Sequence, residues 1–313
     1  MKIEAIEHSH PDIYKARTES NRVLLRLRDN MEATPGISVV ANGSLARGEL
    51  TSQSDFDAYP LYKAGKRAAA LKLFERVKSN AGLKEFASEG AFGSALPAVT
   101  VAKNIGGQKD GNRRFTLRML LLLESASIGS REVYDRTIDS VVLRYINDDI
   151  TDKQIGRFLL NDIIRFYRQM CVDFEFKTVE QTKPWGIRYA KLVFSRKLIY
   201  YSGIIMCAEM ASKPASDKRK YLISMINMPP IDRLLATFGD DILDALREYN
   251  YFLSLLDDPG SRKDLAKVQM LRDSHTSLFK EVKERGHRYS RALVDILRAR
   301  YPIDHPIREA LIV

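Results

Sequence analysis

Two aspartates stand two residues apart in the stretch VVANGSLARGELTSQSDFDAY, as Asp55 and Asp57. Because successive side chains of a strand alternate between faces, both carboxylates would project from one face about 7 Å apart, with Phe56 opposite them. Two such like charges repel, and a divalent cation relieves the repulsion. Carboxylates and substrate phosphates are ligands that Mg²⁺ takes in nucleotide sites. The spacing therefore favours Mg²⁺ (or Mn²⁺) at Asp55 and Asp57, whereas an Asp-x-Asp pair alone would equally suit an exposed loop.

A glycine–serine turn precedes these aspartates by about ten residues. Gly43 would let backbone N–H groups approach a phosphate closely, Ser44 adds a hydroxyl donor, and a short helix after the turn would present its N-terminus to an anion. Arg47 follows on that helix and has two interpretations, a phosphate contact or an ion pair with Glu49 or Asp55. The stretch thus predicts a phosphate-binding turn next to a metal site.

The joint pattern of apolar strand, Gly-Ser, spacer and Asp-x-Asp resembles the DNA polymerase beta-like nucleotidyltransferase superfamily. Its ARGE spacer is similar to that of protein-PII uridylyltransferase-like domains, although cyclic-oligonucleotide synthases of bacterial defence use a similar arrangement. The resemblance implies an enzyme that moves an NMP from an NTP to an acceptor hydroxyl and releases pyrophosphate. It assigns Gly43 and Ser44 to the phosphates, and Asp55 and Asp57 to the metal. The acceptor, whether RNA, protein or small molecule, stays open.

Members of the superfamily usually add a third carboxylate from a later strand, and this sequence gives several candidates for it. The strand predicted in LPAVTVAKNI holds no acid, so we expect the third catalytic carboxylate at Glu89. Glu85, Asp110 and Glu124 are the alternatives. Without a third acid, the chain would be a catalytically weak or inactive nucleotide-sensing module with the same fold.

Apolar spacing divides the chain into two parts. Helical periodicity over 11–32 and 64–80 flanks a β-branched run at 37–40 and an extended segment at 54–62. Helical pattern resumes at FTLRMLLLLESAS and is nearly continuous from residue 152 onward. We therefore expect an α+β nucleotidyltransferase domain over 1–148, with a small mixed sheet, followed by an all-α helical domain over 149–313.

The predicted helical domain carries basic residues on the polar face of one helix. Arg188 and Lys191 lie at helical spacing in WGIRYAKLVFSRKLIYYSG. In the superfamily a helical domain supplies Lys or Arg to the triphosphate, so the resemblance implies that both bind nucleotide. A solvated or ion-paired helix face is the alternative.

Charge and cysteine usage limit partners and compartment. The formal net charge of +10 favours anionic partners, so a basic RNA- or DNA-binding protein is a further alternative. Cys171 and Cys207 form no disulfide framework, and the N-terminal MKIEAIEHSHPD has no signal-peptide pattern. The apolar segments are too short to span a bilayer. These features predict a cytoplasmic protein without a membrane partner.

Overall fold

The computed structural model of the protein describes residues 1–30, 34–85, 92–180, 184–269 and 276–312. The chain forms two compact units, an α/β unit and a helical unit. The α/β unit comprises Ala16–Phe158 and Ser212–Pro229, and the helical unit comprises Met1–Lys15, Leu159–Ala211 and Pro230–Val313. A unit with a small mixed sheet and a second, helical unit agree with the coarse fold class expected from the sequence.

A mixed sheet forms the centre of the α/β unit. Among the described residues it has four strands in the order β5–β3–β1–β6, with bounds β1 (Ile37–Ala41), β3 (Ala58–Tyr62), β5 (Leu96–Pro97) and β6 (Ala126–Gly129). β1 is antiparallel to both β3 and β6, whereas β3 and β5 are parallel. Two short strands, β2 (Asp55–Phe56) and β4 (Lys84–Glu85), form a separate parallel pair.

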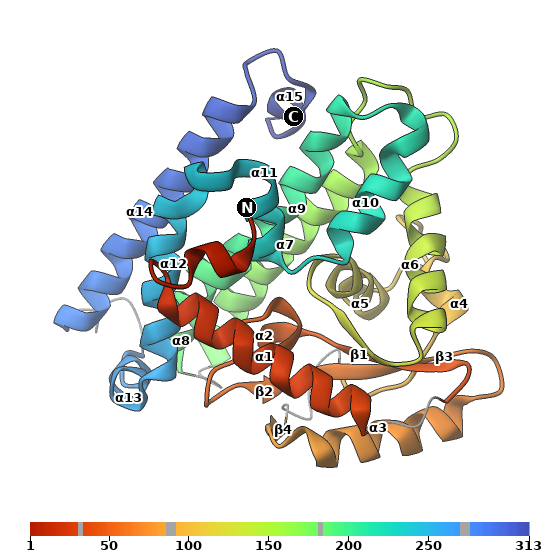
Figure 1. Ribbon diagram of the computed structural model, residues 1–313, viewed down its shortest axis with the longest axis horizontal. Coiled ribbons are helices and arrows are strands. Elements are labelled where there is room, and N and C mark those ends of the chain that lie inside the picture. The colour runs from red at the N-terminus through yellow and green to blue at the C-terminus, as the bar shows by residue number, and fades with distance from the viewer. Residues whose placement is uncertain (31–33, 86–91, 181–183, 270–275, 313) are drawn as a thin grey trace. The chain divides into compact units, whose positions relative to one another are not determined.

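Helices cover the sheet on both faces. In chain order, the α/β unit contains α1 (Pro11–Asp29, from residue 16 onward), α2 (Gly43–Arg47), α3 (Arg67–Ala81), α4 (Ala98–Val101), α5 (Asn112–Leu123), α6 (Arg131–Tyr145) and α10 (Lys218–Ile226). Figure 1 shows α3 below the sheet and α5 and α6 above it.

Every residue of β1 is buried, because both faces of this strand are covered. Ile37, Val39 and Ala41 belong to one apolar core with residues of α1, α2 and α3. On the other face of the sheet, the hydroxyl groups of Ser38 on β1 and Ser127 on β6 form a hydrogen bond, with their Oγ atoms 3.0 Å apart. This arrangement fixes the end of β1, where the Gly43–Ser44 turn begins, between two packed layers.

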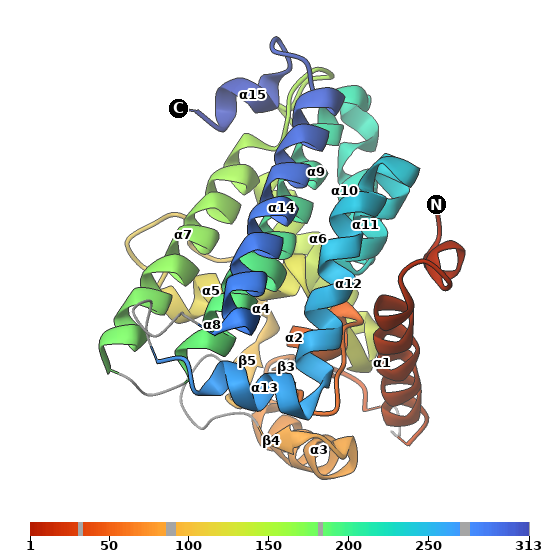
Figure 2. The same ribbon diagram turned by 90° about the vertical axis from the view of Figure 1, so that its left-hand side faces the viewer.

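Aromatic rings pack between helices of the helical unit. Its helices are α7 (Arg157–Glu180, from residue 159 onward), α8 (Trp185–Lys191), α9 (Lys197–Ala208), α11 (Pro230–Phe238), α12 (Leu243–Asp257), α13 (Pro259–Ala266), α14 (Ser277–Arg300) and α15 (Pro306–Ala310). A π-helical segment, Leu192–Arg196, joins α8 to α9. Phe194 of this segment stacks on Phe252 of α12 and on Tyr289 of α14, with ring centroids 4.9 and 5.4 Å away. Figure 2 shows α12 and α14 side by side.

Several predicted elements are confirmed. The helix expected over 64–80 is α3, the strand expected at 37–40 is β1, and the extended segment at 54–62 contains β2 and β3. The helix expected over 11–32 is α1, which ends at Asp29, while 31–33 lie outside the described residues. The long helices expected after residue 152 are interrupted more often, by the π segment and by short 3₁₀ turns.

The strand predicted across 96–105 is wrong beyond its first two residues. Only Leu96 and Pro97 pair with β3, and the chain then turns into α4. Val99 is 62% exposed whereas Val101 is fully buried, so these two valines do not share one strand face. The Thr100 hydroxyl donates to the Pro97 carbonyl at 2.7 Å and supports the start of the helical turn.

Strand β6 differs from the sequence prediction, because the helical pattern of FTLRMLLLLESAS runs through residue 127. Helix α5 instead ends at Leu123, where Glu124 takes an extended φ of −152°. β6 has the sequence ASIG, in which Ile128 is the single large apolar residue, so no alternating pattern marks it. Its pairing with β1 is a tertiary contact that local periodicity does not reveal.

No helix in the described part of the chain combines the length and the apolar character needed to cross a membrane.

Candidate functional site

The turn after β1 is anchored by Asn42, which is fully buried. Its side-chain amide donates to the carbonyl of Glu124 at 3.1 Å and to that of Leu120 at 3.4 Å, and so caps the C-terminal end of α5. Its backbone N–H donates to the carbonyl of Asp57 at 2.8 Å. Asn42 therefore ties the glycine–serine turn to the second aspartate, which lies between β2 and β3.

Gly43 and Asp57 are in direct contact. Gly43 has φ +63°, in the left-handed region, and a Cβ built on it would lie 2.5 Å from Oδ2 of Asp57. Only a residue without a side chain allows the carboxylate to lie this close to the backbone at this φ. The turn and the second aspartate, which are 14 positions apart in sequence, thus form one site.

Ser44 is the one residue of 41–50 that is not buried. The other residues of this stretch are buried, and Leu45 belongs to the apolar core. The Ser44 carbonyl accepts from the backbone N–H of Glu49 at 2.8 Å, which holds the short helix α2 closed. Ser44 is therefore a half-buried, hydroxyl-bearing residue next to Gly43, which contacts Asp57.

Asp55 and Asp57 flank a core residue. Phe56 is 1% exposed and belongs to the same apolar core as β1, whereas Asp55 is exposed and Asp57 half-buried. This alternation is the one expected for two carboxylates on the face opposite Phe56. In the β2–β4 pair, Asp55 lies opposite Lys84.

The third carboxylate is not placed by the structure. Glu89, the predicted residue, lies outside the described residues, and Glu85 is described only as a member of β4 in register with Phe56. Among the described residues, no three or more His, Cys, Asp or Glu side chains gather as metal ligands. Asp55 and Asp57 stay the predicted ligands for Mg²⁺. One or two carboxylates with substrate phosphates is a set that Mg²⁺ takes.

The two other candidate acids are both engaged in buried ion pairs. Asp110 forms a bidentate ion pair with Arg118, and their side chains are 1% and 0% exposed. Glu124 accepts a hydrogen bond from Nη1 of Arg47. Each acid thus compensates a buried guanidinium within the α/β unit.

Arg47 forms buried ion pairs. Its Nε donates to Glu49 at 2.7 Å and its Nη1 to Glu124, and all three side chains are at most 8% exposed. Of the alternatives left by the sequence, the pair with Glu49 is present. Because burying a guanidinium is favourable only with charged partners, this network holds α2 against the end of α5.

Arg188 and Lys191 belong to α8 of the helical unit. Arg188 donates from Nη2 to the carbonyl of Phe174, and its guanidinium lies 4.8 Å from the centre of the Phe174 ring. Burial lowers the pKa of Arg188, and Asp173 and Glu175 act in the opposite direction. The Lys191 carbonyl accepts from the Ser195 hydroxyl at 3.0 Å. A nucleotide-binding role for either residue stays a prediction.

Sequence comparison assigns no relative to the chain, since no family model and no curated protein sequence matches it.

Proposed function

We propose that this protein is a Mg²⁺-dependent nucleotidyltransferase that moves an NMP from an NTP to an acceptor hydroxyl. The observation that carries the proposal is the contact between the Asp57 carboxylate and Gly43 at the turn after β1. Gly43, Ser44, Asp55 and Asp57 are the residues to which the resemblance gives phosphate and metal binding. A phosphate-binding turn next to a carboxylate is the arrangement that such a reaction uses.

In this proposal, Gly43 leaves room for phosphate oxygens at the turn and Ser44 donates its hydroxyl to one of them. Asp55 and Asp57 would hold Mg²⁺, which would neutralise charge on the transferred phosphoryl group. The buried Phe56 and the hydrogen bond from the Asn42 backbone N–H to the Asp57 carbonyl fix the backbone that carries both carboxylates. Such fixed geometry lowers the barrier because no reorganisation is needed during the reaction.

The bond changes are those of an in-line displacement. The acceptor oxygen forms a bond to the α-phosphorus, and the bond from the α-phosphorus to the bridging oxygen breaks. Pyrophosphate leaves with that electron pair, and the acceptor proton passes to a base. Glu89 is the residue proposed as that base on the strength of the resemblance.

The test is transfer from each α-labelled NTP with Mg²⁺, using RNA, the protein itself and small hydroxyl compounds as acceptors. We expect the Asp55→Asn/Asp57→Asn variant to lose more than about 100-fold of the transfer rate, since even outer-shell partners of metal ligands contribute about 10–100-fold. Asp139→Asn is the control, because it makes the same type of substitution at an exposed position on α6.

Two outcomes would contradict the proposal. NTP-induced stabilisation of the fold without transfer to any acceptor would indicate the nucleotide-sensing alternative. Salt-sensitive binding of RNA or DNA that survives loss of both aspartates, again without transfer, would indicate a nucleic-acid-binding protein.

A further inference from the structure

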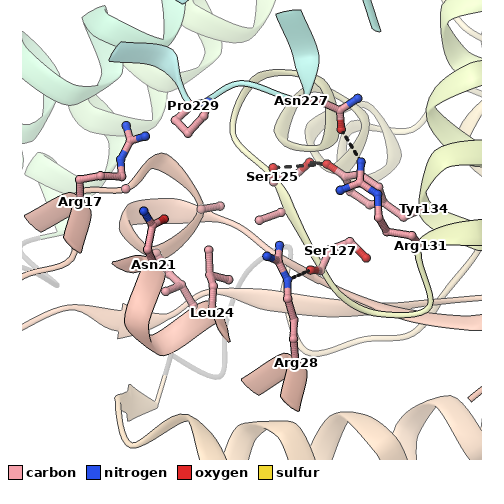
Figure 3. A pocket seen from close by; sticks show the side chains of 14 residues that line it. Arg17, Asn21, Leu24, Arg28, Ser125, Ser127, Arg131, Tyr134, Asn227 and Pro229 are labelled. Atoms are coloured by element: carbon pink, nitrogen blue, oxygen red, sulfur yellow. Dashed lines mark hydrogen bonds between the residues drawn. The ribbon is translucent and has the colours of Figure 1, made fainter. Parts of the chain in front are cut away.

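A cavity of about 160 Å³ lies within the α/β unit, and its lining includes Leu45, Ala46 and Gly48, which follow the glycine–serine turn in the chain. It is lined by residues of α1, α2, β6 and α6, and by the chain segment just before α11 (Figure 3). Its described lining includes none of Gly43, Ser44, Asp55 and Asp57. The cavity is therefore a separate feature that the proposed function does not use.

Three guanidinium groups line this cavity. They belong to Arg17 and Arg28 of α1 and to Arg131 of α6, and the described lining contains no carboxylate. In the view of Figure 3, Arg17 and Arg131 lie on opposite sides and Arg28 reaches in between them. Three cations around one small space repel each other, and a bound anion would relieve that repulsion.

The hydrogen bonds of Arg28 and Arg131 leave donors available. Arg28 donates from Nε to the Ser127 carbonyl at 3.0 Å, and within the described residues its Nη atoms have no other partner. Arg131 donates from Nη2 to Asn227 at 3.1 Å and from Nε to Asp135 at 3.2 Å. Partial burial, together with the nearby Arg131 charge, lowers the pKa of Arg28. The two side chains are thus oriented by their Nε bonds while terminal N–H groups remain for a ligand.

Arg17 is built into the wall of the cavity. It is 5% exposed, and it packs so closely on Gly48 that a Cβ there would lie 2.1 Å from its Nε. Gly48 has φ +73°, so a glycine is favoured at this position for two reasons. A guanidinium held in this way is preorganised and does not lose side-chain entropy when an anion arrives.

We propose that this cavity binds a phosphoryl group, as free phosphate or as a small phosphate monoester. Guanidinium groups match phosphate oxygens with paired N–H donors. The volume is below the range of pockets that enclose whole drug-sized ligands, so a single phosphoryl group fits better than a complete nucleotide. The Asn21 side chain of the lining offers a further polar contact.

Calorimetric titration with inorganic phosphate and with phenyl phosphate, at constant ionic strength in chloride, tests this site. We expect saturable one-site binding that weakens at least about tenfold in Arg28→Gln and in Arg131→Gln, because each loses a charged donor. Arg22→Gln is the matched control, since Arg22 is on the same helix, is exposed and pairs with Glu19. It should bind phosphate as the unmodified protein does. Circular dichroism confirms that each variant is folded.

The outcomes separate the possibilities. Phosphate and phenyl phosphate binding alike indicates a site for the phosphoryl group itself, whereas a preference for the ester indicates a phosphorylated small molecule. No saturable binding, or equal weakening in all three variants, overturns the proposal. So does binding of an RNA oligonucleotide that depends on Arg28 while phosphate does not bind. Binding should be retained in Asp55→Asn/Asp57→Asn, so failure of the proposed function leaves this site intact.

Discussion

Replacing Asp110 by alanine should lower the free energy of unfolding by about 3–5 kcal/mol, because it leaves the Arg118 guanidinium buried without its carboxylate. Arg118 is fully buried and donates to Asp110 from Nη1 at 3.0 Å and from Nη2 at 2.5 Å. Its Nε donates to the Tyr145 hydroxyl at 2.9 Å, so the substitution also disturbs contacts between α5 and α6. Urea denaturation followed by circular dichroism measures the loss.

Glu19→Ala is the control for this prediction. Glu19 pairs with Arg22 in an exposed i,i+3 arrangement, where both side chains are more than 40% exposed. Such pairs contribute less than about 1 kcal/mol, so the control should differ little from the unmodified protein. Replacing both partners, as Asp110→Leu/Arg118→Met, should recover much of the loss because no charge is then buried. A loss of less than about 1 kcal/mol in the free energy of unfolding of Asp110→Ala would contradict the buried ion pair between Asp110 and Arg118.

Replacing Gly43 by alanine should destabilise the α/β unit and displace the Asp57 carboxylate. The left-handed φ of +63° alone costs an alanine about 1–2 kcal/mol. The new Cβ would also lie 2.5 Å from Oδ2 of Asp57, so that the carboxylate must move at a further cost of about 1–3 kcal/mol. We expect the variant to lose nucleotide binding as well, because Asp57 no longer lies at the turn.

Gly65→Ala separates these two effects. Gly65 has a similar φ of +78°, but a Cβ at this position meets no atom within 4 Å among the described residues. Its loss of stability should therefore be the backbone cost alone, with nucleotide binding unchanged. Equal losses of stability in the two variants would show that a Cβ at Gly43 does not clash with Asp57. Unchanged nucleotide binding in Gly43→Ala would show that the contact with Asp57 has no functional consequence.

Local sequence predicted the part of the candidate site that is contiguous in the chain. The β-branched run of β1, the glycine–serine turn and the alternation around Phe56 are all encoded within about 20 residues. Each depends on strand periodicity or on the freedom of glycine, which a single segment reveals. The close approach of Asp57 to Gly43 follows once β1 and β3 pair as antiparallel neighbours.

The remaining features depend on contacts between distant segments. The ion pairs of Arg47 with Glu124 and of Arg118 with Asp110 join different elements. One signal was present, since Arg118 interrupts the apolar run FTLRMLLLL and an arginine there must be buried with a partner. The arginine cavity has no comparable signal, because its guanidinium groups come from α1 and α6, which are far apart in the sequence.

Calorimetry of NTP binding with and without Mg²⁺ tests the central claim most directly, because it needs no knowledge of the acceptor. We predict binding that depends on Mg²⁺, that is lost in Asp55→Asn/Asp57→Asn, and that is retained in Asp139→Asn. Nucleotide binding that is indifferent to Mg²⁺, or that survives the loss of both aspartates, would contradict the assignment of Asp55 and Asp57 as the metal ligands.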